Sequence, residues 1–131
     1  MLLSFYQRFV EPIQIGSKVH TMRDAPKRDP RIGETLHMYT GGYQAKRTLI
    51  SKKEKLISKQ RALIRISITK KSSDLFIVID GRSLQWEEVT QFVKFDGFRN
   101  VDEFIRYWTN DMKKKHIRKK QVLFHWTSLR Y

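Results

Sequence analysis

A strict two-residue alternation of apolar and polar side chains is the feature that most limits the possible folds of this chain. Ile64, Ile66 and Ile68 are separated by single polar residues, a period typical of a strand with one buried face. A polar turn at 70–74 follows, and residues 75–79 (LFIVI) are continuously apolar. Such a run is typical of a strand buried on both faces. The two segments therefore place a sheet at the centre of the fold.

Four other segments have the composition of strands or extended segments. They are 19–23, 35–40, 46–50 and 122–126. Gly41 and Gly42 end the second of them, and the polar residues 51–60 are expected to be exposed. Together with the two central strands, these segments predict a sheet or barrel of five to six strands.

Three short helices are also predicted. Residues 11–16 have proline in the first turn and Gly16 at the end, which suits a helical C′ position. Asn100 and Glu103 resemble a capping box before the third helix. Apolar stripes with helical spacing follow in 86–95 and 101–112, and they predict core positions for three large side chains. These are Trp86, Phe104 and Trp108. The resulting expectation is a single α+β domain over residues 1–131.

Composition excludes several classes of protein. The chain has no cysteine, so it has neither disulfides nor a thiolate zinc site. Its four histidines are scattered along the sequence, and neither a metal nor a cofactor is predicted. The first residues do not have the pattern of a signal peptide. No window reaches the roughly 18 apolar residues of a membrane span, and a soluble, cytoplasmic protein is expected.

Basic residues strongly outnumber acidic ones, 27 to 13, for a formal net charge of +14. The excess lies in two stretches: 44–71 has ten basic residues and one acid, and 106–120 has seven and one. Such clustering favours a binding surface for a polyanion, most commonly nucleic acid. The alternatives are a merely soluble basic protein and, less favoured, an anionic membrane surface, because no helix pairs a broad basic face with a strongly apolar one.

Several groups of residues resemble the signature of ASCH domains, in the same order along the chain. They are Phe5, Gln7, Arg8 and Phe9 with Ile13, Gly16, Lys18, Thr21 and Arg23; Gly33, Glu34, Leu36, Tyr39, Thr40 and Gly41; Asp96, Gly97 and Phe98 with Glu103 and Phe104; and His125 with Trp126. The resemblance touches nearly the whole chain. It implies a PUA-like mixed or antiparallel β-barrel with about three short helices, which agrees with the strand-rich pattern.

The resemblance also implies two functions. Many ASCH domains are regarded as RNA-binding modules that use the cleft of the barrel. A small bacterial branch instead hydrolyses the acetyl amide of acetylated cytidine with a lysine, a threonine and a glutamate. Lys18 and Thr21 match the first two positions, and Asp96, one methylene shorter than glutamate, is the best match for the third. The fold alone does not decide between them.

The chemistry of these residues is consistent with either function. Thr21 would attack an acyl carbonyl, or position the attacking water, once a base accepts its proton. Lys18 would be that base if burial or a neighbouring cation lowers its pKa well below about 10.4. Arg23 shares a strand face with Thr21 and would hold a phosphate or an oxyanion, and Asp96 would orient a base edge or relay a proton. The plain alternatives are a solvated lysine, a β-forming threonine and a turn aspartate.

The first function predicted is binding of RNA or of a modified nucleoside. The cleft would contain Lys18, Thr21, Arg23 and Asp96, while the two basic stretches contact phosphates. The phosphate contacts are assigned to Lys52, Lys53, Lys113, Lys114 and Lys115. Tyr43, beside the glycine pair, is the best candidate for an exposed side chain that stacks on a base; Tyr39, Phe98 and Trp126 are further candidates. The alternative function is an amidohydrolase for acylated cytidine, with Lys18 as base, Thr21 as nucleophile and Asp96 as acid or orienting group.

Overall fold

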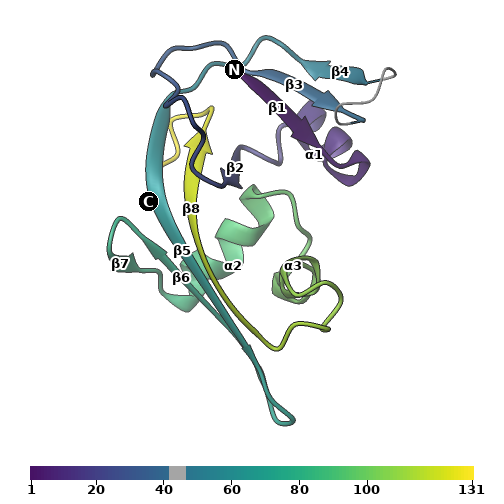
Figure 1. Ribbon diagram of the computed structural model, residues 1–131, viewed down its shortest axis with the longest axis vertical. Helices are drawn as coiled ribbons and strands as arrows, with labels where there is room; N and C mark the ends of the chain where they lie inside the picture. The colour runs from purple at the N-terminus through teal and green to yellow at the C-terminus, as the bar shows by residue number, and fades with distance from the viewer. Residues whose placement is uncertain (42–46) are drawn as a thin grey trace.

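The largest element of the computed structural model, which describes residues 1–41 and 47–131, is a five-stranded sheet (Figure 1). Its strands are β2 (His20–Arg23), β8 (His116–His125), β5 (Ser58–Ile68), β6 (Ser73–Ile79) and β7 (Arg82–Ser83), in that order across the sheet. All neighbouring pairs are antiparallel. The long central strands β5 and β8 form the backbone of the fold.

The predicted alternation in β5 is confirmed. Ile64, Ile66 and Ile68 are buried, whereas Arg65 is exposed. The interpretation of 75–79 as a strand buried on both faces was wrong, because the side chain of Phe76 is 58% exposed. An apolar run does not reveal whether anything covers the second face of a sheet, and here the helices cover only one.

A three-stranded sheet is stacked at one end of the molecule. Its order is β1 (Leu2–Phe5), β3 (His37–Thr40) and β4 (Thr48–Ser51). β1 is parallel to β3, and β3 is antiparallel to β4. The described residues thus form eight strands in two separately hydrogen-bonded sheets, more strands than the five to six predicted. The predicted segments did not include β1 or the two-residue β7.

The three predicted helices are present. They are α1 (Val10–Ile15), preceded by the short 3-10 helix η1 (Gln7–Phe9), α2 (Trp86–Phe95) and α3 (Val101–Trp108). Gly16 ends α1 at φ 84°, and Asn100 caps α3 by accepting a hydrogen bond from the Glu103 amide. The stripe predicted to reach Met112 stops at Trp108, because Asn110 to Met112 adopt positive φ angles. Trp86 is 58% exposed, so its predicted core position was wrong.

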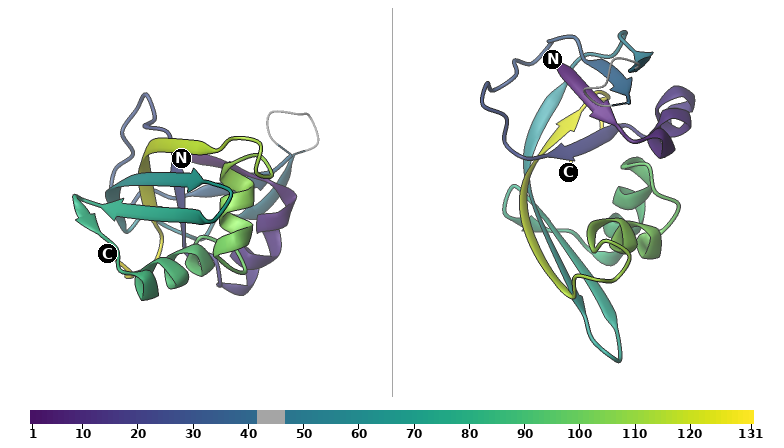
Figure 2. Two further views of the ribbon diagram at one scale, coloured as in Figure 1. Left: turned by 90° about the horizontal axis from the view of Figure 1, so that it is seen from below. Right: turned by 45° about the vertical axis from the view of Figure 1, so that its right-hand side comes forward.

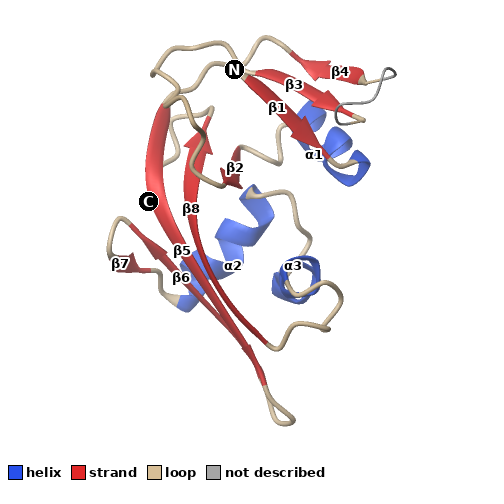
Figure 3. Cartoon of the chain, viewed as in Figure 1, coloured by secondary structure: helices blue, strands red, loops and turns tan. Residues whose placement is uncertain are grey.

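Helices α2 and α3 lie on one side of the five-stranded sheet (Figures 2 and 3). The buried apolar side chains form one cluster, which includes Ile64 and Ile77 of the sheet together with Phe92 and Phe104 of the helices. The α+β class is therefore confirmed. Within the described residues, no helix is long and apolar enough to cross a membrane.

Candidate functional site

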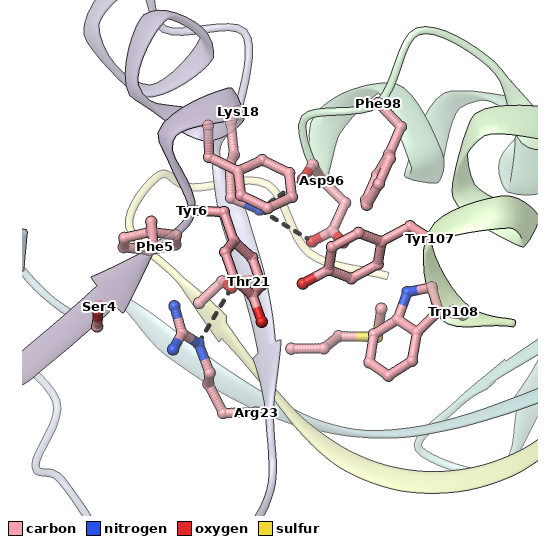
Figure 4. A pocket seen from close by; sticks show the side chains of 12 residues that line it. Ser4, Phe5, Tyr6, Lys18, Thr21, Arg23, Asp96, Phe98, Tyr107 and Trp108 are labelled. Carbon is pink, nitrogen blue, oxygen red and sulfur yellow. Dashed lines mark hydrogen bonds and ion pairs between the residues drawn. The ribbon is translucent and has the colours of Figure 1, made fainter. Parts of the chain in front are cut away.

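A pocket of about 370 Å³ opens where the end of β1, strand β2, the turn after α2 and helix α3 meet (Figure 4). Its volume is within the range of small-molecule sites. It is lined by Ser4, Phe5, Tyr6, Phe9, Lys18, Thr21, Met22, Arg23, Asp96, Phe98, Tyr107 and Trp108. The four residues of the predicted cleft are among them, so the pocket brings Lys18 together with Asp96, 78 positions later in the sequence.

Backbone contacts fix the segment that carries three of these side chains. The Lys18 amide donates to the Pro12 carbonyl at 2.9 Å, and the Val19 amide donates to the Phe95 carbonyl at 2.8 Å. Strand β2 then pairs with β8, with Thr21 opposite Phe124. Alternation along β2 places Thr21 and Arg23 on the same face, as the sequence predicted.

Lys18 is 2% exposed and points at Asp96. Its Nζ donates to the Asp96 carbonyl oxygen at 2.5 Å and lies 3.5 Å from Asp96 Oδ1. The ammonium also sits 4.7 Å from the centroid of the Phe9 ring. Burial lowers the pKa of Lys18 to about 8, against the opposing effect of the Asp96 carboxylate, and Arg23 lowers it further. The alternative of a solvated surface lysine is therefore wrong, and Lys18 is buried with a lowered pKa.

His20 does not line the pocket, but its ring contacts Asp96. Its Nδ1 lies 3.0 Å from Asp96 Oδ1 and its Nε2 lies 2.7 Å from the Tyr131 hydroxyl. A carboxylate only accepts, so Nδ1 carries the proton of the neutral ring and Nε2 accepts from Tyr131. Burial lowers the pKa of His20, which favours this neutral form. Asp96 is thus held by two side chains through one oxygen.

Thr21 is linked to Arg23 and not to Lys18. Arg23 Nε donates to Thr21 Oγ1 at 3.4 Å, and its guanidinium lies 4.6 Å from the centroid of the Phe5 ring. Among the contacts of the described residues, no hydrogen bond joins Lys18 to Thr21. The order of proton transfer predicted from sequence would need one of these side chains to move.

Aromatic rings form the walls of the pocket. Tyr6 and Tyr107 stand edge to face with centroids 6.1 Å apart, and Figure 4 shows the Tyr107 hydroxyl directed toward the middle of the pocket. Trp108 Nε1 is buried and has no hydrogen-bond partner within the described part of the chain. Unsatisfied buried donors are rare, so an acceptor on a ligand would satisfy this one.

Gly97 allows Lys18 to reach its place. Its φ is +99°, and a Cβ added there would lie 2.9 Å from Lys18 Cδ and 2.9 Å from Phe9 Cδ1. Gly33 has a similar φ of +90°, but a Cβ added there would meet nothing within 4 Å. An alanine at either position would have a strained backbone, but only an alanine at Gly97 would also collide with neighbouring side chains.

Gly97→Ala is expected to lower the free energy of unfolding by about 2–4 kcal/mol, since positive-φ strain of about 1 kcal/mol or more adds to overpacking of about 1–3 kcal/mol. Gly33→Ala, the matched control, should lose only the stability that corresponds to the positive-φ strain, about 1 kcal/mol or more. Urea unfolding of both variants measures the difference. Equal losses in the two would mean that the Lys18 stem is not confined by Gly97.

The predicted phosphate-binding lysines lie outside the pocket. Lys52 and Lys53 follow β4, whereas Lys113, Lys114 and Lys115 precede β8, and all five are exposed. β4 lies near the top of Figure 1, whereas β8 begins in the lower half of the view, so the two groups are far apart along the long axis. Tyr43 lies outside the described residues. Of the other predicted stacking residues, Phe98 and Trp126 are 3% and 6% exposed, which was not expected.

Four further polar or aromatic side chains around the pocket were not predicted from the sequence. His20, Tyr6, Tyr107 and Trp108 reach the site from three different elements. His20 lies between the predicted site residues Lys18 and Thr21 in the sequence, at the first position of β2, and that position was the one available signal. Tyr107 and Trp108 are on a helix whose stripe was interpreted as core, because spacing does not separate the wall of a pocket from an interior.

Within residues 1–41 and 47–131, no three or more His, Asp or Glu side chains are grouped so that they could hold a metal ion. No family model, curated protein or solved structure matches this chain.

Proposed function

We propose that this chain is an ASCH-like domain, related to PUA-like barrels, that binds RNA or a modified nucleoside with one base inside the pocket. The observation that carries the proposal is the composition of the pocket wall. Lys18, Arg23 and Asp96 offer two cations and one carboxylate to a polar ligand, within a ring of aromatic side chains. Flat aromatic walls with a few polar groups suit a nucleobase.

Different polar groups of the pocket would bind different parts of a nucleotide. The guanidinium of Arg23 would hold a phosphate. Asp96 Oδ1 is already engaged by Lys18 and His20, which leaves Oδ2, to which no described residue donates, to accept from the amino edge of a base. Trp108 Nε1 would donate to a carbonyl of the ligand. Arg23, Asp96 and Trp108 would each then have a ligand group of matching chemistry.

Tyr107→Leu is expected to weaken binding of a free nucleoside by roughly 5- to 150-fold, because base stacking on an aromatic ring contributes roughly 1–3 kcal/mol. Calorimetric titration with cytidine and acetylated cytidine measures this. The matched control is Tyr39→Leu, since Tyr39 lies on β3 and does not line the pocket. No binding at millimolar nucleoside, or equal losses in the two variants, would contradict the proposal.

A second candidate function is hydrolysis of acylated cytidine, favoured by the lowered pKa of Lys18. With a pKa of about 8, a substantial minority of Lys18 side chains are neutral at pH 7.5 and able to accept a proton. Thr21 lines the same pocket, and Arg23 would stabilise the oxyanion. Rotation of Lys18 from Asp96 toward Thr21 would complete the nucleophile and base pair.

The titration samples with acetylated cytidine also test this second function, when cytidine release is followed by chromatography. A hydrolase should turn over faster as the pH rises through about 8, and Lys18→Met should abolish turnover. Release that continues unchanged in Lys18→Met excludes Lys18 as the base. No release by the unmodified protein would leave binding as the function.

A further inference from the structure

The five-stranded sheet has a second face, opposite to α2 and α3 (Figures 1 and 3). Directly opposed residues of antiparallel strands share a face, so the strand register shows which side chains gather there. We define the basic sheet face by six of them: Arg61, Leu63, Arg65, Phe76, Arg118 and Lys120. None of these residues lines the pocket.

Like charges meet directly on this face. Arg65 is opposite Arg118 on β8, and Lys120 is opposite Leu63 one row further. Opposed like charges destabilise an antiparallel pair. The ion pairs made by the described residues include none with Arg65, Arg118 or Lys120. Arg61 is paired with Asp80, and Asp74 opposite Ser67 places one carboxylate on the same side of the sheet. Arg65, Arg118 and Lys120 keep positive charge that no ion pair of the described residues compensates, and a polyanion would neutralise it.

An exposed aromatic ring completes the row. Phe76 on β6 is directly opposite Arg65, so Arg118, Arg65 and Phe76 run side by side across three strands. Phe76 is 58% exposed, whereas its neighbours Leu75 and Ile77 are buried under the helices. An exposed aromatic ring beside cations on a sheet is a combination that binds an unpaired base and its phosphates.

We propose that the basic sheet face binds an extended single strand of nucleic acid, with phosphates on Arg65, Arg118 and Lys120 and a base stacked on Phe76. The proposal rests on the nucleic-acid function proposed above but uses a different surface. A sulfated polymer or an anionic membrane would engage the charges without needing the ring. The phenyl ring is therefore the feature that distinguishes a nucleic-acid strand from other polyanions.

The test measures the anisotropy of a fluorescein-labelled oligouridine at several salt concentrations. Arg65→Gln/Arg118→Gln is expected to weaken binding roughly tenfold or more at low salt and to reduce the slope of log K against log salt by about 1.4, at about 0.7 per phosphate. Phe76→Leu should weaken binding roughly tenfold with the slope unchanged. Lys94→Gln/Arg99→Gln is the matched control, because both side chains are exposed and belong to α2 or to the segment between α2 and α3, on the other side of the sheet.

Several outcomes would overturn the proposal. One is equal loss of affinity in the Arg65→Gln/Arg118→Gln variant and the control; another is unchanged binding in Phe76→Leu. Displacement of the oligonucleotide by anionic vesicles as readily as by unlabelled oligouridine would assign the face to a membrane. Nucleoside affinity should be unaffected by the face variants, so failure of the pocket proposal and failure of this one are separately visible.

Removing the Arg65 and Arg118 repulsion should not lower the free energy of unfolding.

Discussion

Asp96→Asn is expected to lower the free energy of unfolding by about 3–5 kcal/mol at pH 7, the usual effect of removing one partner from a buried ion pair. Lys18 is 2% exposed and its Nζ is 3.5 Å from Asp96 Oδ1. Without the carboxylate, the buried ammonium keeps the Asp96 carbonyl as an acceptor but loses its counter-charge. Urea unfolding measures the change. Asp102→Asn, at an exposed ion pair with Arg106, should change the free energy by less than about 1 kcal/mol.

The loss of stability in Asp96→Asn should depend on pH, because Lys18 titrates differently in the folded and unfolded chains. Lys18 has a pKa of about 8 in the folded protein and about 10.4 when unfolded, so stability rises with pH between these values, where the unfolded chain binds more protons. Asp96 raises the pKa of Lys18, so Asp96→Asn should lower it and start the rise below pH 8. The difference in free energy of unfolding between Asp96→Asn and the unmodified protein should therefore become smaller as the pH rises toward 8.

A double variant separates charge from packing. Lys18→Met in the Asp96→Asn background removes the unpaired ammonium, so the double variant should be at least as stable as Asp96→Asn alone. A further loss of more than about 1 kcal/mol on adding Lys18→Met would show that Lys18 contributes mainly through its packing against Phe9.

The second large effect is expected in acid and comes from His125. This ring is fully buried; its Nε2 donates to Gln60 Oε1 at 3.0 Å, and its Nδ1 has no partner among the described residues. Protonating Nδ1 would place a charged donor in the core without an acceptor. Burial therefore lowers the pKa of His125 to about 3, with a smaller effect of His20 in the same direction.

The unfolded chain binds this proton near pH 6.5, so stability is lost as pH falls from about 6.5 toward 3. His125 alone would contribute on the order of 5 kcal/mol to the loss, and His20, whose pKa is also lowered, acts in the same direction. His125→Gln should lose distinctly less stability over this interval than the unmodified protein. His116→Gln, at an exposed position of β8, should follow the unmodified protein. Equal acid sensitivity of all three proteins would rule out His125 as the cause.

The sequence was sufficient for those parts of the fold whose pattern is local. The alternation in β5, the glycine after α1 and the Asn100 cap of α3 each depend on a few neighbouring residues, and each prediction was confirmed. The exposure of Phe76 was not predictable, because it depends on which face of the sheet receives the helices. The early end of α3 was missed because positive φ angles at 110–112 interrupt an apolar spacing that otherwise continues.

The candidate site shows the same division. Lys18, Thr21 and Arg23 lie within six residues of one another in the sequence. They were predicted as one group, and all three line the same pocket in the structure. Asp96 was added through the family resemblance alone. Tyr107 and Trp108 were missed because their role depends on α3 facing β2 across a gap, which is a property of the tertiary packing. The link between Asp96 and His20 likewise required the turn after α2 to meet β2.

The pairing of β2 with β8 has a consequence for the order of folding. His20 is registered with His125, so the strand that carries Thr21 and Arg23 must wait for a partner more than a hundred residues away, and closing such long loops is slow. The β5–β6 hairpin needs only the short turn between residues 68 and 73. We therefore expect early folding intermediates to contain a formed hairpin while the Lys18 ammonium is still in water. The pocket around Lys18 would be among the last features to form.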